Sequence, residues 1–199
     1  MALPIRFVPE RGSARLVVGE ANRVAIQALD DPSAWPFRTA LLVGPPRSGR
    51  SSLAAWFAAR GRGEAIDDAD ARDDAEVFHR WNRAQESATP LLLVAREGWD
   101  IELPDLRSRL GAAQPLALRA PDDAMVPALM QAHAARLGLA LGEGAIAYLA
   151  PRVTRSYAAI EALVAAIDRL TLERKAPPTL AIWREALEAV EGVDQPSLF

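Results

Sequence analysis

The chain has 199 residues, half of them hydrophobic and a quarter charged, with a formal net charge of −3 at pH 7. This length suits one core domain with a small appendage, and the negative charge argues against a protein that binds DNA by itself. Cysteine is absent, which excludes disulfides and thiolate metal sites and is expected of a cytoplasmic protein. No apolar run approaches the ~20 residues of a membrane span, and the N-terminus lacks a signal-peptide pattern, so no membrane association is expected.

The first 120 residues predict strands that alternate with helices. Short apolar runs bounded by glycine or proline predict strands over 39–43, 64–67, 90–95 and 115–119. Helical patterns occupy the segments around them, at about 20–29, 51–60, 73–88 and 106–110. Because the strands are apolar throughout rather than alternating, we expect a parallel sheet covered by helices on both faces.

Beyond Pro121 the strand signal stops. Helices are expected over 122–138, 143–150, 155–175 and 179–190, with Asp122, Thr154 and Thr179 as candidate N-caps. The predicted fold class is therefore α/β, with a reduced P-loop sheet of about four parallel strands followed by a small all-helical lid. We place a base domain at 1–120, the lid at 121–190 and a flexible tail at 191–199.

A phosphate-binding loop is the most specific motif in the chain. Residues 44–51 read GPPRSGRS, which has the spacing G-x-x-x-x-G-K-[ST] with Arg50 in place of lysine, and they lie between a predicted strand and helix. Backbone N–H groups of such a loop hold phosphates, and the Ser51 hydroxyl can reach magnesium. The alternative is a plain Gly/Pro turn before a helix. The expected nucleotide contacts are Gly44, Pro45, Pro46, Arg47, Ser48, Gly49, Arg50, Ser51 and Ser52.

Arg50 changes what this loop is expected to do. A guanidinium is bulkier than a compact ammonium and cannot bridge the β- and γ-phosphates in the same manner. Lys175 is the only lysine in the chain, so drift toward arginine is one explanation. We favour the other, a site that binds ADP or ATP and hydrolyses little; the preference between the two nucleotides is left open.

Two carboxylates, Asp67 and Asp68, lie at the end of the short strand 64–67. Asp67 is expected to hold magnesium together with Ser51, and Asp68 stands where many ATPases carry a glutamate that orients water. The alternative is an acidic loop, since Asp70, Asp73 and Asp74 crowd the same stretch. Asp67 follows Gly44 by only 23 positions. A strand–helix unit that commonly separates these motifs is therefore missing, and the lost strand is expected at the sheet edge.

Arg109 is the candidate for a role on another molecule. It lies in the segment LPDLRSRL, residues 103–110, on a predicted short helix. There it can project to a neighbouring subunit and stabilise charge on the γ-phosphate as an arginine finger. The alternative is a solvated surface charge.

Together these segments resemble the DnaA family of AAA+ proteins and, within it, the Hda-like regulators. The resemblance covers about residues 15–190 and rests on VVGEANR (17–23), FHRWNR (78–83) and LPDLRSRL (103–110). It implies that Val18 lies beside a bound adenine and that Arg109 is the finger. Hda-like proteins also carry arginine at the position of Arg50, whereas the family's sensor arginine falls here at Ala158. The chain ends about where the lid ends, so the family's DNA-binding domain is not expected.

The last five residues, QPSLF, resemble the pentapeptide that docks on the bacterial sliding clamp. An amide hydrogen bond and two apolar anchors on a mobile tether are the chemistry of such a motif. The alternatives are a disordered tail without a partner, or a clamp contact through the N-terminal segment Ala2–Ile5. The expected clamp-binding residues are Gln195, Ser197, Leu198 and Phe199.

The preferred hypothesis is a regulator of replication initiation that binds adenine nucleotide and the sliding clamp and stimulates ATP hydrolysis by DnaA. By itself it is not expected to be an efficient ATPase. The alternatives are an autonomous P-loop ATPase or kinase, a DNA-binding initiator paralogue, and a DnaA-paralogue adaptor without a stimulating role. Self-association and the identity of the partner are left open by the sequence.

Overall fold

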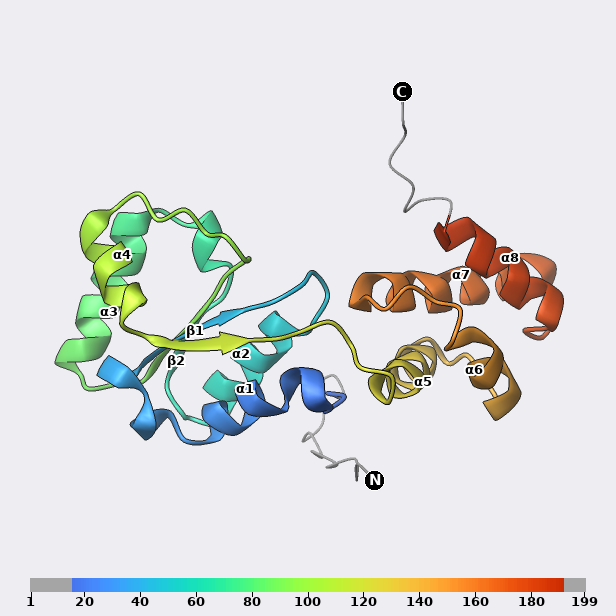
Figure 1. The fold of residues 1–199 in the computed structure, drawn as a ribbon, viewed down its shortest axis with the longest axis horizontal. Coiled ribbons are helices and arrows are strands. Elements are labelled where there is room, and N and C mark those ends of the chain that lie inside the picture. Colours follow the sequence, from blue (N-terminus) through green and yellow to red (C-terminus); the bar gives the residue numbers. More distant parts are fainter. Residues whose placement is uncertain (1–15, 192–199) are drawn as a thin grey trace. The chain divides into compact units, whose positions relative to one another are not determined.

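The structure is a computed structural model that describes residues 16–191, with the side chain of Glu191 left aside. Within these residues the chain divides into two compact units, a base unit up to Arg119 and a lid unit from Ala120 onward. Figure 1 colours both units along the sequence.

The base unit is built on four parallel strands. They are β1 (Thr39–Val43), β2 (Glu64–Ile66), β3 (Leu91–Val94) and β4 (Gln114–Ala117), in the spatial order β2-β3-β1-β4. The predicted four-stranded parallel sheet is thus confirmed. β2 pairs only with β3 among the described residues, so the sheet is short at the edge where a missing strand was expected.

Helices cover both faces of this sheet, and β3 shows why its sequence is apolar throughout. Leu92 and Val94 pack in one core with helices α1 (Glu20–Asp30) and α2 (Arg50–Ala59). Leu91 and Leu93 pack in a second core with α3 (Asp74–Glu86) and α4 (Pro104–Gly111). Because successive side chains of a strand point to opposite faces, a strand buried on both sides has no polar position. Figure 1 shows the same grouping of the helices.

The lid unit is helical throughout its described part. It contains α5 (Met125–Leu137), α6 (Glu143–Leu149), α7 (Tyr157–Arg174) and α8 (Leu180–Glu191), and α7 packs against both α5 and α8. No helix within residues 16–191 combines the length and apolar character needed to cross a membrane.

Three helix caps were expected, at Asp122, Thr154 and Thr179, and Thr179 stays a prediction. The residue directly before α5 is Ala124, which offers no side-chain cap, but Asp122 bonds to the start of this helix. Asp122 Oδ1 accepts from the N–H groups of Ala124 and Met125, both at 3.0 Å. Thr154, however, is not the cap of α7. Ser156 holds that role, because its backbone is extended directly before the helix and its Oγ accepts from the Ala159 N–H at 3.0 Å. Three short 3-10 turns were also not expected: Pro32–Ala34, Pro36–Arg38 and Ala69–Ala71.

Candidate functional site

The phosphate loop connects the carboxyl end of β1 to the first turn of α2. Gly49 precedes the helix with φ +88°, a left-handed conformation that side chains disfavour, and its carbonyl accepts from Leu53 N–H at 2.9 Å. The first N–H groups of α2 have no partners within the helix itself. They therefore form an anion-binding position at the end of the loop. Ser51 and Ser52 are exposed in that first turn.

The start of the loop is fixed by close packing. A Cβ added to Gly44 would lie 2.8 Å from Leu118 Cβ and 3.3 Å from Ser48 Oγ, so a larger residue would displace the loop. Leu118 in turn donates its N–H to Val43 O at 2.9 Å, which continues the pairing of β1 with β4. Ser48 is 5% exposed, and its hydroxyl has no hydrogen-bond partner among residues 16–191. The loop thus holds one buried hydroxyl whose hydrogen-bonding capacity is unused within the described part of the chain.

Arg50 is directed toward the neighbouring strand. Its Nη1 donates to the carbonyl oxygen of Ala95, the residue that follows β3. Ala95 is itself buried and offers no polar side chain beside the loop. The guanidinium is therefore anchored to backbone at the carboxyl edge of the sheet, where a lysine ammonium would be a mobile point charge.

Asp67 was expected to hold magnesium and Asp68 to orient water. Both carboxylates lie at the carboxyl ends of the strands, as the phosphate loop does. Asp67 directly follows β2, is half-buried, and its Oδ1 accepts from Asp68 N–H at 3.1 Å. Asp68 is exposed and has φ +49°. No cluster of three or more His, Cys, Asp or Glu side chains suited to a metal occurs among residues 16–191. Magnesium at Asp67 would thus depend on nucleotide phosphates as well, which is how this ion commonly binds.

The remaining acidic residues of this stretch have separate structural tasks that sequence reasoning did not find. Asp73 caps α3 by accepting from Ala75 N–H at 2.8 Å. Asp74 Oδ2 accepts from the N–H groups of Glu102 and Leu103, at 2.7 and 2.9 Å. The position of Asp73 directly before an apolar helical pattern could have predicted its role as an N-cap. The partners of Asp74 are remote in sequence, so no sequence pattern predicts that contact.

Asp70 forms an ion pair that the sequence analysis also did not predict. Its side chain is 6% exposed and accepts from Arg96 Nε at 2.5 Å and from Arg96 N–H at 3.3 Å. Burial opposes ionisation of this carboxyl, but the hydrogen bonds and charge of Arg96 outweigh it and lower the pKa of Asp70. The pair joins the turn after β2 to the loop after β3.

This pair gives a pH-dependent stability. Because folding lowers the pKa of Asp70, its contribution should be complete above the ordinary value of 3.8 and should be lost as the pH falls through and below it. The difference in melting temperature between wild type and Asp70→Asn should therefore shrink as the pH is lowered from about 7 to about 3. Glu76→Gln is the control, since its pair with Arg72 is exposed on both sides. A difference that widens toward acid pH would contradict this reading.

Arg109 lies near the amino ends of the strands, whereas the phosphate loop follows the carboxyl end of β1. Its guanidinium stands 4.9 Å from the ring centroid of Trp81, whose Nε1 donates to Thr39 Oγ1 at 3.1 Å. Thr39 is the first residue of β1, and the loop follows the last, Val43. At roughly 3.3 Å per residue the strand separates the two ends by about 13 Å. Arg109 is therefore placed away from phosphates bound in its own loop.

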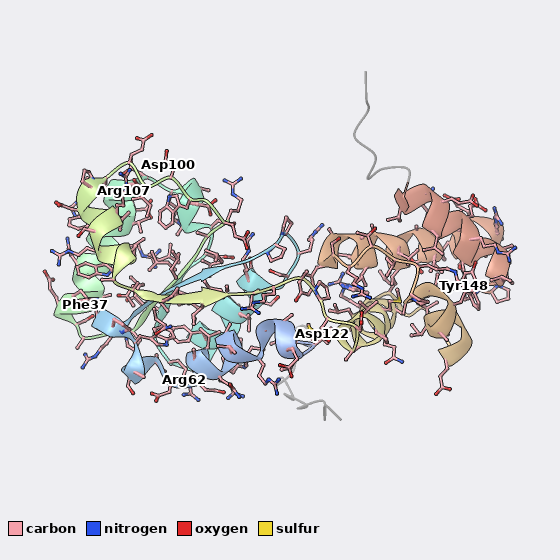
Figure 2. All side chains as sticks on the ribbon, in the orientation of Figure 1. Phe37, Arg62, Asp100, Arg107, Asp122 and Tyr148 are labelled. Carbon is pink, nitrogen blue, oxygen red and sulfur yellow. The ribbon has the colours of Figure 1, made fainter. Side chains whose placement is uncertain are left out.

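Arg107, two positions earlier, is held within its own segment. Its Nε donates to Ile101 O at 2.9 Å, and its Nη2 lies 3.8 Å from Asp100 Oδ1. Figure 2 shows Arg107 and Asp100 on the same side of the base unit. The sequence did not show that the two arginines have different environments. In the structure Arg109 lies over the ring of Trp81, whereas Arg107 donates to a backbone carbonyl.

The segment before α1 is organised by Asn22, a residue that the sequence did not single out. Asn22 is 2% exposed; its Oδ1 accepts from Gly19 N–H at 2.9 Å and its Nδ2 donates to Val17 O at 2.8 Å. Val18, the expected adenine contact, is half-buried and packs against the core that holds α1 and α2. The expected clamp residues Gln195–Phe199 and the segment Ala2–Ile5 lie outside the described residues.

No family model and no curated protein sequence matches this chain. Solved structures do match it. Domain III of the Thermotoga maritima replication initiation protein DnaA superposes with a TM-score of 0.71 at 13% identity, covering 87% of this chain and 93% of that one. The chain has the fold of DnaA domain III.

Two further solved structures share this fold. The FIGL-1 AAA domain in complex with ADP gives a TM-score of 0.64 at 14% identity, over 96% of this chain and 86% of that one. Replication initiator DnaA bound to AMPPCP and single-stranded DNA gives 0.60 at 17% identity, over 79% of this chain and 65% of that one. At these identities the likeness concerns the fold, and the chain spans about two thirds of the DnaA–AMPPCP structure.

The first turn of α7 holds the position where a sensor arginine was expected. Ala158, where the resemblance expects a sensor arginine, is exposed in the first turn of α7. Its neighbour Tyr157 is buried, which raises the pKa of its hydroxyl to about 12 with a smaller contribution from the charge of Asp122. Arg155 precedes the helix and pairs with Asp123 at 2.7 Å. The start of α7 therefore presents a methyl group where a cation was expected.

Proposed function

We propose that this chain is a nucleotide-binding AAA+ regulator that acts on a partner ATPase, in the manner of an Hda-like regulator of DnaA in replication initiation. The observation that carries the proposal is the separation of its two candidate functional groups. The phosphate loop lies at the carboxyl edge of the sheet, and Arg109 lies near the amino edge, on Trp81. An arginine so placed can meet a phosphate only on another molecule, which is the role of a finger in trans.

The chain's own site is suited to holding nucleotide rather than to turning it over. Ser51 and Asp67 would hold magnesium on ADP or ATP, and the loop N–H groups with the helix terminus would hold the phosphates. Arg50 is anchored to the Ala95 carbonyl, and Asp68 is a short, exposed side chain in a left-handed turn. Neither is well placed to activate water or to bridge the transferred phosphate.

The partners follow from the sequence and the charge. We propose DnaA loaded with ATP as the molecule that receives Arg109. The sliding clamp is proposed to bind the terminal Gln195–Phe199 segment. The net charge of −3 makes direct DNA binding an unfavourable alternative.

Calorimetry tests the nucleotide site. The full chain should bind ADP and ATP in a magnesium-dependent manner, with its own turnover well under about 1 s⁻¹, the low end for ordinary enzymes. Ser51→Ala should weaken binding in magnesium but change little in EDTA, because the lost hydroxyl acts through the ion. Ser108→Ala, an exposed serine on α4, is the control. Brisk hydrolysis by the isolated protein would contradict the proposal, and absent binding would show that the loop does not hold nucleotide.

A further inference from the structure

The second 3-10 turn, Pro36–Arg38, has a strained backbone and leads directly into β1. Phe37 and Arg38 both have φ +50°, a left-handed conformation that costs energy for residues with a bulky side chain. The Phe37 side chain is 59% exposed, and Figure 2 shows it pointing outward from the base unit. Burial of the ring therefore does not compensate for the strained backbone.

Hydrogen bonds to α3, to the residues just beyond it and to the first residue of β1 hold the strained turn in place. Gln85 Nε2 donates to Phe37 O at 2.9 Å, and Thr39 Oγ1 donates to the same carbonyl at 3.0 Å. Arg38 Nη1 donates to Ala88 O, just beyond the helix, at 2.8 Å. A conformation fixed by three side-chain hydrogen bonds is over-determined by its surroundings, which is typical of strain kept at functional positions.

The same network reaches the candidate finger. Thr39 Oγ1 also accepts from Trp81 Nε1 at 3.1 Å, and Arg109 stacks on the ring of Trp81. Phe37, Arg38 and Arg109 are all exposed and are connected through Thr39 and the end of α3. We call these three residues the amino-edge surface.

The charge of this surface is unbalanced. Arg38 and Arg109 form no ion pair with any described residue, whereas Arg62, Arg96 and Arg155 each pair with a carboxylate. The other large exposed apolar side chains, Val24, Leu137, Leu172 and Leu180, lie in regular helices. The surface thus combines an exposed aromatic ring on a strained backbone with two guanidiniums that have no carboxylate partner among the described residues. This composition is typical of a binding hot spot for an anionic partner.

We propose that the amino-edge surface docks on the phosphate-bearing face of a second AAA+ module. Arg109 meets the nucleotide, Arg38 meets anionic groups around it, and the Phe37 ring enters an apolar pocket beside them. This rests on the proposed function of Arg109 and adds the anchor that orients it. A lone arginine lends little affinity at an exposed rim, whereas a buried aromatic ring supplies it.

The test measures association of the full chain with DnaA loaded with a non-hydrolysable ATP analogue, and the rate at which it stimulates DnaA's ATP turnover. Phe37→Asn should weaken association by at least about tenfold, because the ring is a hot-spot residue and asparagine accepts the left-handed conformation. Phe37→Tyr keeps the ring and should bind within about twofold of wild type. Val24→Ala removes an exposed apolar side chain from α1 and should bind normally. Melting temperatures should be unchanged or raised in Phe37→Asn.

The outcomes separate this inference from the function on which it rests. If wild type neither binds nor stimulates DnaA–ATP, the proposed function fails. If Arg109→Ala abolishes stimulation while Phe37→Asn behaves as wild type, only the docking surface is wrong. Binding of duplex DNA that Phe37→Asn weakens would assign the surface to nucleic acid and overturn the inference. A marked fall in melting temperature in both Phe37→Asn and Phe37→Gly would show that the ring serves the fold, which would also overturn it.

Discussion

Arg109→Ala should reduce the stimulation of DnaA's ATP hydrolysis by about 10³-fold or more, the scale on which fingers supplied in trans act. The guanidinium stabilises charge that develops on the transferred phosphoryl group, so its loss raises the barrier without removing the docking surface. Single-turnover hydrolysis of ATP prebound to DnaA, with saturating regulator, measures this effect on the chemical step. Association measured with a non-hydrolysable analogue should weaken far less.

The fold should tolerate this change. Arg109 is exposed, and its stacking on Trp81 contributes about 0.5–1 kcal/mol at such a site. For a chain of this length that corresponds to a fall in melting temperature of at most about 4 °C. Nucleotide binding by the chain itself should be unchanged, because the loop lies at the other edge of the sheet.

Two further variants sharpen the comparison. Arg109→Lys keeps the charge but loses the planar fork and the ring stacking, so it should restore only part of the stimulation. Arg107→Ala is the matched control, because that guanidinium is bonded to Ile101 O and Asp100. If Arg107→Ala is as defective as Arg109→Ala, the helix as a whole is needed and the specific role of Arg109 is wrong.

The fold could be predicted because each of its elements is marked by a pattern within a short stretch of sequence. The apolar run Leu91–Val94 is buried on both faces, so its pattern indicated a buried strand of a parallel sheet. Glycine and proline before Arg50 marked the loop, and the change of pattern beyond Pro121 marked the helical part. The misassigned cap shows the limit. Thr154 and Ser156 are both cap-forming residues, and only the backbone conformation decides which one precedes the helix.

The candidate site was predictable only where the motif is contiguous in sequence. The spacing of residues 44–51 indicated a loop between a strand and a helix, and the structure has β1 and α2 on its two sides. Asp70 and Arg96 are 26 positions apart, and neither residue type reveals a partner at that separation. Phe37 was missed because an exposed aromatic in a left-handed turn contradicts ordinary preferences. Such local violations are expected where function constrains the chain, and sequence propensities carry no signal for them.

Deletion of residues 195–199 should abolish binding to the sliding clamp. The segment Gln195–Phe199 offers an amide and two apolar side chains, a combination that suits a shallow hydrophobic pocket. A motif of this size buries little surface, so micromolar affinity of about −7 to −8 kcal/mol is expected for one copy. Because the clamp is a ring with more than one pocket, two linked copies would bind more tightly than one. Surface plasmon resonance on immobilised clamp measures the loss.

Deletion of residues 195–199 should not change the stability of the lid. Its last described helix, α8, is fixed by Ile182, Ala186 and Leu187, all buried ahead of the deleted segment. The melting temperature should therefore stay within the error of the measurement, and a destabilisation above about 1 kcal/mol would mean that the segment packs on its own lid. The double substitution Leu198→Ala, Phe199→Ala should reproduce the deletion, because it removes only the apolar anchors. If clamp binding survives the deletion but is lost on removing residues 2–5, the N-terminal segment is the contact instead.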